Sequence, residues 1–152
     1  MTESKFGPHV TPWKFLHVSR LAYNALIETS LITNESWSDT IGKALELEGM
    51  VTTAHNNGGD FATFLPSEDD PIRKDYETEG IVAISLTVNL VPKSHVGLLI
   101  SAPPKDTAFD RYSLVLNRAL QRWRDVIVAQ NAGGGAAIRK SADEDFVHVV
   151  YS

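Results

Sequence analysis

The sequence predicts an α+β fold, in which an antiparallel sheet of roughly five strands packs against one long C-terminal amphipathic helix and two N-terminal helices. Apolar residues recur at intervals of three and four towards both ends of the chain, and they alternate with small or polar residues in its middle. Short turns rich in Asn, Gly and Pro separate the predicted strands. Strands joined by such turns pair antiparallel, so we expect the helices to lie outside the run of strands.

Length and composition indicate one globular domain that covers residues 1–152. Hydrophobic residues make up 43% of the chain and charged residues 22%, which is enough apolar surface to form a buried core. We find no internal repeat and no domain boundary in the sequence.

The charge and the missing cysteines restrict the possible functions. The formal net charge is −5, which disfavours binding to nucleic acid or to an anionic membrane surface. Because the chain has no cysteine, it has no disulfide framework, no thiolate nucleophile and no cysteine zinc site. The N-terminal residues lack the apolar core of a secretory signal, and we therefore expect a soluble, cytoplasmic protein.

A first helix is predicted after a flexible arm at residues 1–9. Thr11 is in the capping position, Pro12 occupies the first helical position, and the helical pattern fades near Ser30. The buried stripe predicted for this helix consists of Phe15, Val18, Ala22, Ala25 and Leu26.

A second, shorter helix is predicted from about residue 35 to residue 47. Asn34 is its expected cap, and Gly49 is the residue expected to end it. It precedes two segments, 50–55 and 61–65, that flank an Asn-Asn-Gly-Gly sequence. Because Asn-Gly is typical of tight hairpin turns, we predict two antiparallel strands here.

The middle of the chain holds an acidic segment and a clear strand pattern. Residues 67–80 contain six carboxylates and no apolar period, which predicts a mobile acidic loop. Residues 81–91 alternate between apolar and small polar side chains, and residues 95–101 form the returning strand. The small polar face is formed by Ala83, Ser85, Thr87 and Asn89. It suits a face covered by a second protomer or a ligand cavity, and a plain solvent-exposed face is the alternative.

The strongest helical pattern follows Asp106 and runs from Phe109 to Ile127. We expect this helix to lie across the apolar side of the ribbon that starts at Ile81. A triple glycine at 133–135 ends the helix, and strands are predicted at 136–139 and 146–151.

Arg111, Arg118 and Arg122 follow one another in this helix at intervals of seven and four, which places them on one side. Such a stripe is suited to a carboxylate-rich partner or a phosphate. The alternative is an ordinary solvent-exposed face, with Asp125 as a local ion-pair partner of Arg122.

His55, His95 and His148 all fall on predicted strands, where they are weak catalytic candidates. If they converged with Asp60, a hydrolytic or metal site would follow, but chance placement is the simpler interpretation. No histidine pair has the spacing with which a helix grips a metal, so we expect no metal and no cofactor.

These patterns favour a non-catalytic protein–protein interaction module or assembly subunit, with another protein or a second copy of the chain as its partner. The alternative is a small-molecule-binding domain or a small cofactor-free enzyme with a cavity between the sheet and the long helix. Three tryptophans are candidates to line such a cavity: Trp13, Trp37 and Trp123.

Overall fold

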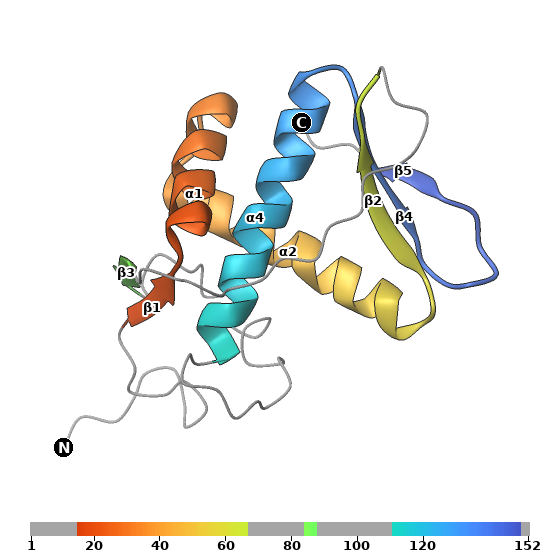
Figure 1. The fold of residues 1–152 in the computed structure, drawn as a ribbon, viewed down its shortest axis with the longest axis horizontal. Helices are drawn as coiled ribbons and strands as arrows, with labels where there is room; N and C mark the ends of the chain where they lie inside the picture. The colour runs from red at the N-terminus through yellow and green to blue at the C-terminus, as the bar shows by residue number, and fades with distance from the viewer. Residues whose placement is uncertain (1–14, 67–83, 88–110, 150–152) are drawn as a thin grey trace.

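The computed structural model describes residues 15–66, 84–87 and 111–149, which form an α+β fold (Figure 1). In chain order the elements are β1 (Phe15–Val18), α1 (Arg20–Thr33), α2 (Trp37–Asn56), β2 (Asp60–Phe64), β3 (Ile84–Thr87), α4 (Arg111–Asn131), β4 (Gly135–Arg139) and β5 (Val147–Val149). Within these ranges there are three helices and a three-stranded antiparallel sheet that packs with the C-terminal helix α4. The predicted α+β class is confirmed. The described strands do not form one sheet of five, because β1 and β3 make a separate antiparallel pair.

The three-stranded sheet has the order β2-β4-β5, with β4 at its centre. Phe61 of β2 lies opposite Ile138 of β4, and Ile138 lies opposite Val147 of β5. Side chains alternate between the two faces of a sheet, and the face that carries Phe61 and Ile138 is the one that joins the hydrophobic core. Figure 1 places this sheet on the opposite side of the helices from the β1–β3 pair.

The first helix begins later than the sequence predicts, at Arg20. Ser19 caps it, and the Ser19 hydroxyl accepts a hydrogen bond from the backbone N–H of Ala22 at 3.0 Å. Residues 15–18, predicted as part of this helix, form strand β1 and pair with β3. The predicted cap at Thr11 and the predicted arm at 1–9 lie outside the described residues.

A buried asparagine of α4 explains why the backbone before α1 is extended. The side-chain oxygen of Asn117 accepts the N–H of Ser19 at 2.6 Å, and its amide nitrogen donates to the carbonyls of His17 and Ser113. The Ser113 hydroxyl accepts the N–H of His17 at 2.9 Å. These bonds satisfy backbone groups that a helix would otherwise have satisfied internally.

The connection between α1 and α2 also differs from the prediction. Asn34, expected to cap α2, instead ends α1 in the left-handed conformation with φ 56°, and its N–H donates to the carbonyl of Ser30. The hydroxyl of Ser36 caps α2 by accepting the N–H of Asp39 at 3.1 Å. The helix then continues through Gly49, the residue expected to stop it, as far as Asn56.

The predicted hairpin at 50–65 is wrong in its first strand, because Met50–His55 forms the last turns of α2. Its second strand is confirmed as β2. Gly58 adopts a positive φ of 79°, and the N–H of Gly59 donates to the carbonyl of Ala54 at 2.7 Å. This is the Schellman pattern of a helix end. Asn-Gly favours positive φ in a helix end as well as in a hairpin turn, so the dipeptide alone does not separate the two.

Helix α4 ends in the same way as α2. Gly133 has a φ of 92°, and the N–H of Gly134 donates to the carbonyl of Ala129 at 2.8 Å. The pattern Ala-x-Asn-x-Gly-Gly occupies both 54–59 and 129–134, a short internal repeat that was not expected. In each case the helix passes directly into a strand of the same sheet.

The second glycine of each helix end touches the neighbouring strand. A Cβ at Gly59 would lie 1.8 Å from the carbonyl oxygen of Arg139, and a Cβ at Gly134 would lie 2.0 Å from that of Phe64. Both distances are far shorter than any contact between nonbonded atoms allows. The sequence therefore needs glycine at both positions for close backbone approach.

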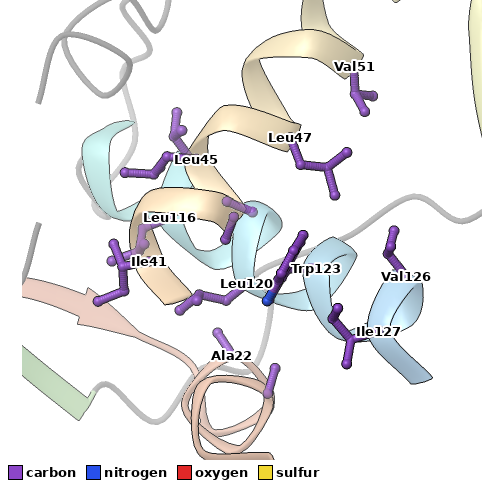
Figure 2. Close-up of a cluster of buried hydrophobic side chains, with 14 of the residues drawn as sticks. Ala22, Ile41, Leu45, Leu47, Val51, Leu116, Leu120, Trp123, Val126 and Ile127 are labelled. Atoms are coloured by element: carbon purple, nitrogen blue, oxygen red, sulfur yellow. The ribbon is translucent and has the colours of Figure 1, made fainter. Parts of the chain in front are cut away.

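The hydrophobic core is built around α4, which packs against α1 and α2, against β1, and against β2 and β4. In Figure 2 the Trp123 ring lies at the centre of this cluster, among side chains from α2 and α4. The largest fully buried side chains are Val18, Leu26, Ile41, Leu45, Leu47, Val51, Leu116, Leu120, Trp123 and Val126. The apolar stripe predicted for α4 is therefore confirmed over its described length.

The partner expected for that stripe is described only in part, because residues 81–83 and 88–91 of the ribbon lie outside the described residues. The described part of the ribbon from Ile81, strand β3, pairs with β1, while the buried face of α4 packs mainly on α1 and α2. Of the two C-terminal strands, 136–139 is confirmed within β4 and 146–151 is confirmed in part as β5. The predicted returning strand at 95–101, the cap at Asp106 and the acidic segment 67–80 lie outside the described residues.

Candidate functional site

A buried carboxylate on α2 faces two arginines of α4. Glu48 is 5% exposed; its Oε1 accepts a hydrogen bond from Nε of Arg122 at 2.9 Å, and its Oε2 lies 3.5 Å from Nε of Arg118. The two arginines are four residues apart, so both side chains project from the same side of α4. The structure thus brings together two of the three arginines that the sequence singled out.

Arg122 is not on a solvent-exposed helix face, as the simpler interpretation of the arginine stripe required. It is 8% exposed, and its guanidinium lies 5.6 Å from the centre of the Phe61 ring. Asp125 forms an ion pair with Arg124, whose Nη1 lies 3.8 Å from its Oδ1. Arg122 therefore ties α4 to α2 through Glu48 and to β2 through Phe61.

A groove of about 900 Å³ lies beside this cluster, between α2, α4 and β4. Its apolar wall includes Leu45, Val115 and Ile138, and its charged lining includes Glu46, Glu48, Arg118 and Lys140. Met50 and Thr53 also line the groove, and both are exposed. Arg118 lines the groove and keeps 30% of its side chain exposed. It is also the arginine with the longer contact to Glu48, 3.5 Å.

Two of the three candidate histidines, His55 and His148, lie in the described ranges, near opposite ends of β2. His55 is exposed near the end of α2, with its Nε2 3.8 Å from Oδ1 of Asp60. His148 lies on β5 and packs edge-to-face against Phe64, with ring centres 5.1 Å apart. Asp60 and Phe64 are the two ends of β2. His95 lies outside the described residues, and within the described ranges no group of three or more His, Asp or Glu side chains is arranged to hold a metal ion.

The other interaction candidates are placed only by their backbone. Ser85 and Thr87 lie on β3, opposite His17 and Phe15 of β1. Arg111 is the first residue of α4, and Asn89 lies outside the described residues.

Neither Trp37 nor Trp123 is among the described residues that line the groove. Trp123 is 1% exposed in the core, where it also borders a smaller hollow of about 330 Å³ with Thr33, Glu35 and Lys43. Trp37 packs edge-to-face against Tyr23, with ring centres 5.7 Å apart. Trp13 lies outside the described residues.

Sequence reasoning missed Glu48, the residue around which the charged cluster forms. One signal was present, since Glu48 sits among Leu45, Leu47 and Val51 on a helix whose apolar stripe it interrupts. A charged residue in that position must be paired if it is buried. Because the helix was expected to end at residue 47, Glu48 was not considered as part of its buried face.

The described helices include none that is both long and apolar enough to cross a membrane. The chain matches no protein-family model, no curated protein and no solved structure.

Proposed function

We propose that the chain is a non-catalytic interaction module that binds a segment of a partner protein in the groove between α2, α4 and β4. The observation that carries the proposal is the groove itself, about 900 Å³ in volume, with an apolar wall and a partly exposed arginine. Apolar walls favour burial of a side chain of the partner, and a few placed polar groups fix its orientation.

The walls of the groove are held by the core. Leu45 and Val115 belong to the same buried cluster as Trp123, and Ile138 lies on the central strand of the sheet. A groove on packed helices and strands loses little conformational entropy when a partner binds. Met50, which is 42% exposed, adds a flexible thioether that can adapt to apolar side chains of different shape.

A second candidate is a small-molecule-binding domain that uses the same groove. The observation that favours it is the volume, because ligand pockets commonly measure roughly 300–1,000 Å³ and the groove, at about 900 Å³, lies in that range. The two candidates differ in what they bind, and the experiment below separates them.

The partner proposed here is another protein or a second copy of the chain. The face proposed for a second copy is that of β3, the strand that pairs with β1. The sequence of this strand also gives it the small polar positions Ser85 and Thr87. A face of small polar side chains is suited to close approach by a second protomer.

The groove is tested by selecting short random peptides displayed on phage against the wild-type protein. Thr53→Trp places an indole in the groove from an exposed helical position, and Asn24→Trp makes the same kind of change at an exposed position of α1 outside the groove. We expect selected peptides to carry apolar side chains and to bind the wild type and Asn24→Trp alike. Binding to Thr53→Trp should be at least about 10-fold weaker, since the filled groove loses an anchor contact.

Two results would contradict peptide binding in the groove. One is the absence of any enriched peptide, and the other is equal affinity for Thr53→Trp and the wild type. If no peptide is enriched but small aromatic acids perturb the amide resonances of residues around Leu45 and Ile138, the small-molecule candidate takes its place.

A further inference from the structure

We infer that the groove selects an acidic segment, in which a carboxylate binds Arg118 next to an apolar side chain that enters the groove. This inference rests on the proposed function and adds the chemical class of the partner. It is carried by the arrangement of Glu48, Arg118 and Arg122.

In this cluster the carboxylate of Glu48 pairs with the guanidinium groups of both Arg118 and Arg122. Glu48 gives Arg122 the close contact, 2.9 Å, and gives Arg118 only an ion pair at 3.5 Å, which is too long for a strong hydrogen bond. A guanidinium has five N–H donors in a planar fork. The Glu48 contact is made through Nε of Arg118, and the two terminal nitrogens form the fork that would bind a ligand carboxylate.

The surroundings strengthen an ion pair formed at this place. Arg118 retains 30% side-chain exposure, and Val115, one turn earlier on α4, contributes apolar wall to the same groove. Charges interact more strongly beside apolar walls than in open water. Lys140 is a second cationic residue of the lining.

The lining also contains acidic groups, and their position matters. Glu48 is already neutralised by Arg122 and Arg118, so its carboxylate does not repel an incoming anion as a free one would. Glu46 is exposed to solvent, where screening weakens its effect, and it has an interaction partner of its own. An acidic segment is therefore favoured at the Arg118 end of the groove.

The test uses the full chain and the peptides selected on it. Each acidic peptide is compared with its synthetic counterpart, in which Asp and Glu are replaced by Asn and Gln and the C-terminus is amidated. Affinities for the wild type, Arg118→Met and Arg124→Met are measured by fluorescence anisotropy. Arg124→Met is the matched control, because Arg124 lies on the same helix but pairs with Glu28 of α1, outside the groove.

We expect the selected peptides to contain Asp or Glu and to lose about 10- to 100-fold in affinity on Arg118→Met, the range of a charge-assisted hydrogen bond. The amide counterparts should bind the wild type with an affinity that is lower by the same factor, and Arg118→Met should reduce their affinity little further. Arg124→Met should bind the acidic peptides as tightly as the wild type does. Peptides that bind in the groove but lack acidic residues, or ignore Arg118→Met, would overturn the acidic class and leave the proposed function intact. Peptides that ignore Thr53→Trp as well would overturn both.

Discussion

Removing the Glu48 carboxylate should destabilise the fold strongly. In Glu48→Met the side chain keeps its approximate length, but Arg122 loses the partner that lies 2.9 Å from its Nε. The Arg122 side chain is only 10% exposed and cannot turn to water without leaving the Phe61 ring. Breaking a buried pair by removing one partner costs about 3–5 kcal/mol. Urea unfolding, followed by far-UV circular dichroism, measures this loss as a lower midpoint with an unchanged slope.

The double variant gives the sharper result. Glu48→Met with Arg122→Met removes both charges and replaces them with apolar side chains, so it should cost less than Glu48→Met alone. Glu28→Met is the matched control, since it removes the carboxylate partner of Arg124 where both side chains are 42% exposed, and it should cost less than about 1 kcal/mol. The reasoning is refuted if Glu48→Met costs no more than Glu28→Met, or if the two single losses simply add in the double variant.

Three further predictions follow from the core, the helix ends and β3. Trp123→Ala should lower the free energy of unfolding by about 3–5 kcal/mol, as expected for an aromatic that is 1% exposed, and a loss below about 1 kcal/mol in denaturant titrations would contradict its central place. Gly134→Ala should cost at least about 1–3 kcal/mol, because its Cβ would lie 2.0 Å from the Phe64 carbonyl oxygen, and an unchanged melting temperature would argue against that close approach. Replacing Ser85 and Thr87 together by Lys should convert a self-associated protein to the 16.7 kDa monomer in light scattering, whereas an unchanged mass excludes this face as the interface.

The sequence predicts the fold well in segments where the spacing of apolar residues identifies the secondary structure. The stripe from Leu116 to Ile127 is buried throughout its core positions, and the triple glycine does end α4. The strand after it is found at Gly135–Arg139. In these segments local pattern and tertiary packing favour the same structure, so either one is enough to identify the element.

The errors arise where two structures share one local signal. Asn57-Gly58 suits a hairpin turn and a helix end equally, and only the continuation of the stripe through Val51 and Ala54 separates them. Before α1, the backbone at His17 is held extended by Asn117, a residue 100 positions away. No local pattern contains that information.

The candidate site was predictable only in part, for the same reason. The spacing of Arg118 and Arg122 places them on one side of a helix, but what they face depends on how α2 crosses α4. That crossing brings Glu48 to them and leaves the groove beside Leu45 and Ile138. Candidate residues on isolated elements can be found from sequence, whereas their convergence depends on packing between elements.

The matched ends of α2 and α4 have a consequence for how the sheet tolerates change. Gly59 touches the last residue of β4, and Gly134 touches the last residue of β2, so this ladder is clamped at both ends. When a strand pair is fixed at one end only, an inserted residue can be accommodated by a shift in register. When both ends are fixed, the inserted residue has to form a β-bulge. Insertions within β2 or β4 should therefore distort the strand locally and leave the alignment of its ends unchanged.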